Sequence, residues 1–111
     1  MDAPNDKKQQ LLLRFDFARK QNKELMAEIE QYAQTTNRYD TDFMQGYTFQ
    51  TGLNLLKQER HDIFNEENRN SILNSNNNSK EFDFLLQKIE EQIKHHEEIR
   101  FGLNIYFKNL N

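Results

Sequence analysis

The sequence has no cysteine, only three glycines and no long run of apolar residues. Without cysteine the chain forms no disulfide and no thiolate metal site, which fits a cytoplasmic protein. No apolar stretch approaches the ~20 residues that a membrane-spanning helix needs, and residues 1–6 lack the basic start and apolar run of a signal peptide. Gly46, Gly52 and Gly102 are too scattered to form a phosphate-binding loop. We therefore expect a cytoplasmic protein that does not enter a membrane.

Residue patterns that support catalysis are also missing. The serines are Ser71, Ser75 and Ser79, all in or beside an asparagine-rich stretch where no base is held near them. Acidic residues are plentiful, but they lie next to lysines and arginines on predicted helix faces, whereas a catalytic acid needs burial to move its pKa. We predict that the protein is not an enzyme and that it needs no cofactor.

Core-forming residues are scarce as well. The hydrophobic fraction is 35%, the charged fraction is 30% and the mean hydropathy is −1.06. Nine phenylalanines and four tyrosines partly offset this, because burying one large apolar side chain contributes roughly 1.5–3 kcal/mol. A single polar domain of 111 residues then forms a slim helical bundle or shares apolar surface with a second copy. We favour a homodimer.

The clearest element is a long helix predicted over residues 79–110. Asn78 and Glu81 have the spacing of a capping box at its start. Behind that start, apolar residues and His96 recur at intervals of three and four, which places them on one side of a helix. The members of this stripe are Phe82, Leu85, Leu86, Ile89, Ile93, His96, Ile99, Leu103, Tyr106, Phe107 and Leu110. A rod of this kind is not stable alone in water and needs partners for its apolar side.

A second long helix is predicted over residues 7–36, after a short disordered lead at 1–6. Its apolar residues alternate steps of four and three, the heptad spacing of a coiled coil. They are Leu11, Phe15, Ala18, Leu25, Ile29 and Tyr32. Asn22 occupies a seam position, where it either fixes the register of the helices or marks a level at which the seam opens to water. We assign Asn22, Leu25, Ile29 and His96 to an oligomer seam.

The middle segment, residues 42–73, is predicted to be helical but interrupted near Gly46–Gly52, since each glycine costs a helix interior about 1 kcal/mol relative to alanine. The alternation from Tyr47 to Leu53 allows a short strand as the lesser alternative. An asparagine-rich loop follows at 74–78. Together, residues 7–111 are expected to form one all-α domain, with three long helices in an up-down-up antiparallel bundle.

The histidines give little support for a metal site. Glu91, His95 and Glu98 share one side of the last helix, but neither Glu-x-x-His nor His-Glu-x-x-His occurs in the sequence. A solvated charged face is the better interpretation, and we predict no metal. His96 is different because it lies within the apolar stripe. It is either a hydrogen-bonded core histidine or a seam residue whose protonation loosens an interface.

Four apolar residues lie away from these stripes. Leu13 and Phe17 are on the opposite side of the first helix from Leu11 and Phe15, and Phe101 and Ile105 lie behind the stripe of the last helix. Pairs of this kind favour contact with another molecule. Leu13, Phe17, Phe101 and Ile105 are therefore our candidate partner-binding residues, and the leading function is a non-catalytic protein–protein interaction module, such as an adaptor, inhibitor or regulator.

The front half of the first helix suggests an alternative function. It is basic, although the net charge of the chain is −3. Such a run can contact phosphates, which would make the protein a helical nucleic-acid-binding regulator, or it can pair with acidic residues of another helix. The residues of this run are Lys7, Lys8, Arg14, Arg19, Lys20 and Lys23.

Overall fold

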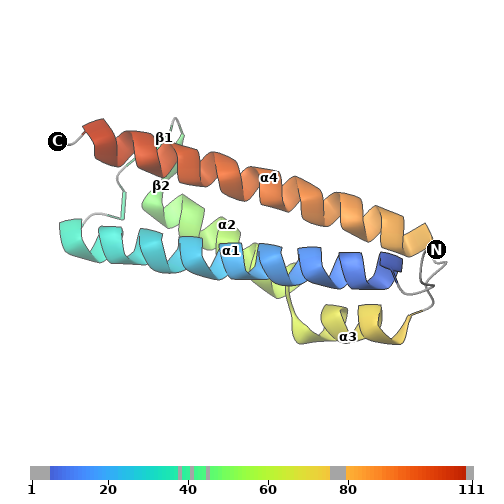
Figure 1. The fold of residues 1–111 in the computed structure, drawn as a ribbon. Coiled ribbons are helices and arrows are strands. Elements are labelled where there is room, and N and C mark those ends of the chain that lie inside the picture. Colours follow the sequence, from blue (N-terminus) through green and yellow to red (C-terminus); the bar gives the residue numbers. More distant parts are fainter. Residues whose placement is uncertain (1–5, 38, 41, 45, 76–79, 110–111) are drawn as a thin grey trace.

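The computed structural model describes residues 6–37, 39–40, 42–44, 46–75 and 80–109 (Figure 1). Its elements, in chain order, are α1 (Asp6–Thr36), β1 (Asp42–Met44), β2 (Tyr47–Thr48), α2 (Phe49–Asp62), α3 (Glu66–Asn74) and α4 (Lys80–Asn109). The all-α class and the up-down-up course of the long helices are confirmed. None of the helices in the described ranges is long and apolar enough to cross a bilayer. The predicted lead at 1–6, apart from Asp6, lies outside the described residues, as does most of the loop predicted at 74–78.

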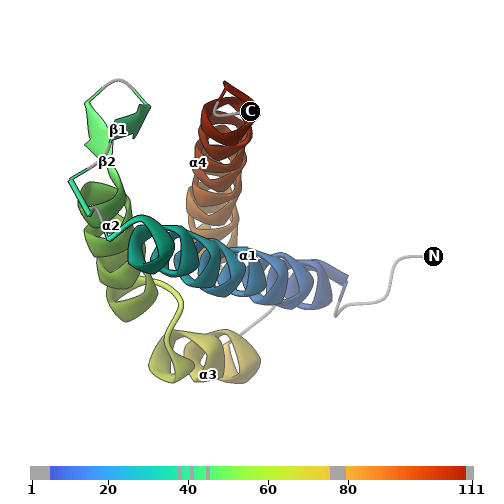
Figure 2. The same ribbon diagram turned by 90° about the vertical axis from the view of Figure 1, so that its left-hand side faces the viewer.

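Helix α1 is the central element of an elongated molecule that measures 52 × 26 × 19 Å. It packs against α4, α2 and α3, whereas α2 and α4 make few contacts with each other (Figures 1 and 2). Helices α1 and α4 run in parallel, and three ion pairs fix their register, one of them between Lys7 and Asp83. Arg14 contacts Glu90 at 2.5 Å, and fourteen residues further along α1, Glu28 accepts a hydrogen bond of 3.1 Å from Arg100. Helices α2 and α4 meet through buried side chains, since Leu53 and Leu56 of α2 share an apolar cluster with Leu103 of α4.

The buried apolar side chains form two clusters. One joins the end of α1 to the start of α2 and the end of α4, and it contains Leu25, Ile29, Ala33, Phe43, Phe49, Leu53, Leu56, Ile99 and Leu103. The other joins the start of α1 to α3 and the first half of α4, and it contains Leu11, Phe15, Ala18, Phe64, Ile72, Phe82, Ile89 and Ile93. The stripes predicted from helical spacing therefore supply both clusters. Three buried polar residues lie between the two clusters, one on each helix: Asn22 on α1, Glu59 on α2 and His96 on α4.

The middle segment is interrupted at a different place from the one predicted. Its helix runs without a break through Gly52 and ends at Asp62, and the interruption lies at 63–65. Asn65 then caps α3 by accepting a 2.7 Å hydrogen bond from the backbone N–H of Asn68. This nine-residue helix falls almost wholly within the segment 42–73 that was predicted to be helical, and the buried side chain of Ile72 holds it in place.

A two-stranded hairpin precedes α2, so the lesser alternative of a short strand is correct for Tyr47–Thr48. The partner strand, Asp42–Met44, was predicted to be helical. Gly46 supplies the positive φ (75°) that the turn between the strands requires. Helix α2 starts directly afterwards, because the Thr48 hydroxyl accepts a 3.0 Å hydrogen bond from the backbone N–H of Thr51.

The hairpin is fixed to α4 at a glycine. A Cβ added at Gly102 would overlap Cγ and Sδ of Met44, so the absence of a side chain lets the hairpin lie against the helix. On the other strand, the Tyr47 hydroxyl and Nε2 of His95 are 3.0 Å apart. These contacts join both strands of the hairpin to α4.

Candidate functional site

A hydrogen-bonded polar layer crosses the interior between the two apolar clusters. Oε1 of Glu59 contacts Nε2 of His96 and accepts a 3.2 Å hydrogen bond from the Asn22 amide. The same amide also donates to the Leu56 carbonyl at 2.9 Å, and Nδ1 of His96 lies 3.0 Å from Oε1 of Gln21. Both imidazole nitrogens face oxygen acceptors, which is the arrangement of a charged imidazolium or of a neutral ring with the Gln21 amide turned round. His96 is thus a hydrogen-bonded core histidine, one of the two predicted alternatives.

The residues assigned to an oligomer seam lie inside a single chain. Asn22, Leu25 and Ile29 have no exposed surface, and His96 is 1% exposed. They face α2 and α4 of the same molecule, so this seam is intramolecular and is not free to join two copies. Asn22 fixes the alignment of α1 with α2 through the Leu56 carbonyl, rather than marking a level where the seam opens to water.

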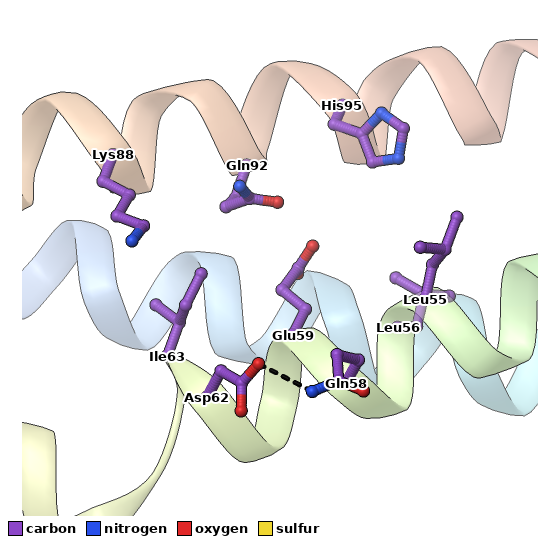
Figure 3. A pocket seen from close by; sticks show the side chains of 9 residues that line it. All are labelled: Leu55, Leu56, Gln58, Glu59, Asp62, Ile63, Lys88, Gln92 and His95. Atoms are coloured by element: carbon purple, nitrogen blue, oxygen red, sulfur yellow. Dashed lines mark hydrogen bonds between the residues drawn. The ribbon is translucent and has the colours of Figure 1, made fainter.

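A pocket of about 290 Å³ lies in the groove between α2 and α4 (Figure 3). Its walls come from both helices, and in the figure the Glu59 side chain rises from α2 toward α4, between Gln92 and His95. The lining residues are Leu55, Leu56, Gln58, Glu59, Asp62, Ile63, Lys88, Gln92 and His95. We call this feature the α2–α4 groove. The residue pattern alone does not reveal this groove, because it depends on the distance between two helices that are separated in the chain.

Two ionisable groups at the groove have shifted pKa values. Hydrogen bonds from Gln58 and His61 lower the pKa of Asp62, so this carboxylate is charged at neutral pH. Desolvation, followed by the nearby charges of Glu59 and Glu98, raises the pKa of the Tyr47 hydroxyl. The Tyr47 phenol therefore stays neutral where it meets His95.

The four predicted partner-binding residues are all exposed. Leu13 and Phe101 are 70% and 67% exposed, and Phe17 and Ile105 are each 45% exposed. The guanidinium of Arg14 lies 5.2 Å from the centre of the Phe17 ring. From the register of the Arg14 and Arg100 ion pairs, the centres of the two apolar pairs lie roughly 20 Å apart along the helices, at 1.5 Å per residue. The structure does not bring them into a single compact patch.

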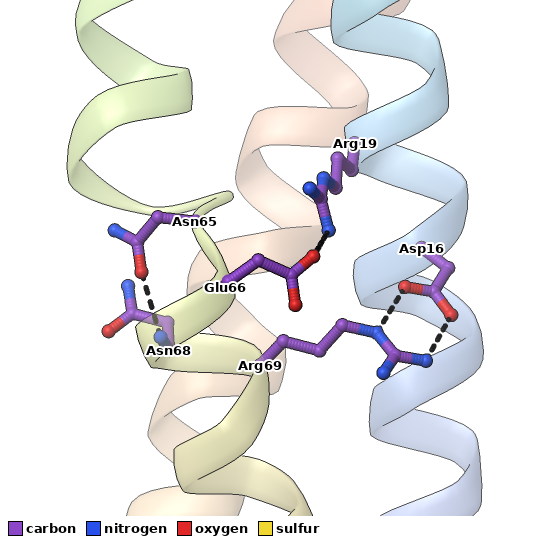
Figure 4. A network of polar contacts seen from close by, with 6 residues as sticks. All are labelled: Asp16, Arg19, Asn65, Glu66, Asn68 and Arg69. Carbon is purple, nitrogen blue, oxygen red and sulfur yellow. Dashed lines mark hydrogen bonds and ion pairs between the residues drawn. The ribbon is translucent and has the colours of Figure 1, made fainter.

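The basic run of α1 is largely used within the molecule (Figure 4). Arg19 pairs with Glu66 of α3 at 2.8 Å, while Asp16, also on α1, binds Arg69 of α3 through both its oxygens. Lys7 contacts Asp83 at 3.0 Å, Lys8 donates to the Leu73 carbonyl and Arg14 pairs with Glu90, whose pKa it lowers by a hydrogen bond. Within the described ranges, Lys20 and Lys23 have no acidic partner. The other four residues of the run fasten α3 and α4 to α1 instead of offering a free basic surface.

The side chains considered as metal ligands do not converge. Nε2 of His95 faces Tyr47, and its Nδ1 is 3.9 Å from the nearest Glu98 oxygen. In the part of the chain that the structure describes, no three histidine or acidic side chains are grouped as a metal ion would need.

Comparison of the chain with protein-family models, with curated proteins and with solved structures found no match.

Proposed function

We propose that the protein is a non-catalytic interaction module, an adaptor, inhibitor or regulator that binds another protein through the outward face of α1 and α4. The observation that supports this is the exposure of Leu13, Phe17, Phe101 and Ile105 at helical spacing. Large apolar side chains cost free energy in water unless a partner covers them, and aromatic residues are frequent energetic centres of interfaces. In this proposal the partner is either a second copy, giving a cytoplasmic homodimer, or a different protein.

The arrangement of charges around Phe17 supports the same surface. Arg14 lies over its ring and is held there by Glu90, so an apolar face is bordered by a fixed ion pair. An apolar centre with a polar rim is the usual anatomy of a protein interface. The basic run supports nucleic-acid binding less well, because four of its six residues already have partners in the molecule.

The test changes Phe17 to alanine and Phe101 to aspartate in the full chain. We expect each change to weaken association by about 2 kcal/mol or more, as for a central aromatic residue of an interface, with unchanged helical circular dichroism. Light scattering reports the mass of the protein alone, and affinity purification from the native host compares the proteins retained by wild type and variants. Leu73→Ala is the matched control, because Leu73 is 43% exposed but lies on α3.

Two results would contradict the proposal. Loss of helical signal in the variants would show that these residues stabilise the fold. Unchanged mass and unchanged retained proteins in both variants would show that the α1–α4 face is not an interface.

A further inference from the structure

Each of the exposed apolar pairs on α1 and α4 belongs to a longer stripe that also carries a lysine and a glutamate. Within a stripe the residues follow one another at steps of four, three and four, so they share one face of their helix. All of them are exposed. The stripe of α1 consists of Leu13, Phe17, Lys20 and Glu24, and the stripe of α4 consists of Lys94, Glu98, Phe101 and Ile105. The apolar pair comes first on α1, whereas the charged pair comes first on α4.

The charged pairs of the two stripes are not used to join the helices of one molecule. In the described part of the chain Lys20, Glu24 and Lys94 take part in no ion pair, and Glu98 has only the 3.9 Å approach to His95. Within one helix, a glutamate four residues before a lysine is stabilising and the reverse order is less so. The lysine comes first in both stripes, so these charges contribute little to their own helices.

The stripes are arranged symmetrically about one level of the α1–α4 pair. The arginine–glutamate ion pairs that join the two helices link residues 76 and 72 positions apart, so residues at the same level differ by about 74, the mean of the two. Asn22, midway in the charged pair of α1, is then level with His96, midway in the charged pair of α4. The midpoint between the two apolar pairs falls at this level as well.

We infer that the two stripes join a second copy of the chain, with the helices of the two copies antiparallel about a two-fold axis at the level of His96. In such an isologous contact the same surface is used by both copies. Helix α1 packs against α1 of the second copy, and α4 packs against α4. Lys20 of each copy then faces Glu24 of the other, and Lys94 faces Glu98.

The same axis brings the separated apolar pairs together. It places Phe17 of one copy at the level of Phe101 of the second copy. Both residues lie beside the line where α1 and α4 meet, since Arg14 over the Phe17 ring binds Glu90, and Phe101 follows Arg100, which binds an acidic residue of α1. The dimer therefore has an aromatic contact at each end and opposite charges between them.

Charge also determines the direction of the second copy. In a parallel arrangement α1 would lie on α4 of the second copy at the same level, which places Lys20 beside Lys94 and Glu24 beside Glu98. Like charges in contact oppose that arrangement. The antiparallel dimer rests on the proposed function for the surface it uses, and it names the partner as a second copy.

The first test reverses one charge at a time in the full chain. We expect Lys94→Glu and Glu98→Lys each to raise the dissociation constant of the dimer about tenfold, because each homodimer then has two like-charged contacts in place of two attractive ones. An equimolar mixture of the two variants should recover the wild-type dissociation constant, since every reversed charge faces an opposite charge of the other chain. Sedimentation equilibrium gives the constants, and native mass spectrometry identifies the heterodimer. Lys88→Glu is the matched control, because Lys88 lies on α4 but lines the α2–α4 groove.

The second test measures the direction of the two chains. The sequence contains no cysteine, so Gln10→Cys gives a single site for a spin label on the exposed side of α1. This position is twelve residues before the axis, so the two labels of an antiparallel dimer should be about 35 Å apart at 1.5 Å per residue. A parallel dimer would hold them within about two helix diameters, or roughly 20 Å. Double electron–electron resonance distinguishes the two distances.

Three results would overturn the antiparallel dimer: a wild-type chain that stays monomeric, a mixture of the charge variants that does not recover the dimer, or the short label distance. If the chain is monomeric but Phe17→Ala and Phe101→Asp lose a protein of the native host, the second copy is refuted and the proposed function stands. If these two variants change neither the mass nor the retained proteins, both are refuted.

Discussion

At the scale of single residues, the stability of the polar layer depends on the contact between the Glu59 carboxylate and the His96 imidazole. The His96 ring is completely enclosed, and the carboxylate of Glu59, which it contacts, is 8% exposed at the side chain. A buried carboxylate that loses its partner keeps its desolvation cost and loses the compensating interaction. The contact between α2 and α4 at this level therefore stabilises the fold only while both residues are present.

The first residue-scale prediction concerns this pair. His96→Leu should destabilise the protein by about 3 kcal/mol, because Glu59 is left buried beside an apolar side chain. Adding Glu59→Leu should recover most of that loss, since well-packed apolar replacements of a buried pair are often neutral or stabilising. Urea denaturation of the two single variants and the double variant measures the coupling energy. Additive losses would mean that the contact contributes nothing specific.

Two of the three residues of this layer could be singled out from the sequence. Asn22 and His96 occupy apolar stripes, so helical spacing places both on the core side of their helices, although it left open whether Asn22 meets water. Glu59 was missed because it lies in the polar stretch 57–62, where its residue type does not distinguish it from its solvated neighbours. The available signal was the gap in the stripe between Leu56 and Ile63, which a buried polar residue must fill.

At the scale of elements, the hairpin and α4 depend on each other through Gly102. Gly102→Ala should destabilise the protein, because the new methyl group overlaps the Met44 side chain. In a Met44→Ala background the same change should be neutral or stabilising by up to about 1 kcal/mol, since alanine is the better helix former. Thermal denaturation of all four proteins gives the comparison. A stabilising effect of Gly102→Ala in the wild-type background would contradict the close packing of the hairpin.

The elements also show where sequence spacing is insufficient. The long helices were predicted to within a residue or two, because each has a stripe of at least six apolar positions at helical spacing, with a single polar residue, Asn22 or His96, within it. The break in the middle segment was predicted at the wrong place, because glycine was taken as a sign of a helix break. Gly52 instead lies inside α2, where a Cβ would be 3.4 Å from Ile29, and the break at 63–65 has no glycine or proline. The usable signal there was Asn65 followed by two glutamates, the pattern of a capped helix start.

At the scale of the whole molecule, the polar layer raises the question of whether the two apolar clusters fold as one unit. Helices α1 and α4 pass through both clusters without interruption, so local unfolding of one cluster would have to break both helices in the middle. Small single domains with shared elements usually unfold in one cooperative step. The continuity of two long helices thus favours a single transition despite the division of the core.

The last prediction tests this cooperativity. Leu53→Ala removes buried volume from the cluster at the end of α1 and should destabilise the protein by about 2–5 kcal/mol. If the molecule is one cooperative unit, amide exchange of the most protected residues accelerates equally around Leu53 and around Ile89 in the other cluster. Ile89→Ala, which removes volume from the opposite side of the polar layer, should give the same uniform pattern. Acceleration confined to the half that carries the substitution would show that the layer of Asn22, Glu59 and His96 divides the protein into two independently unfolding parts.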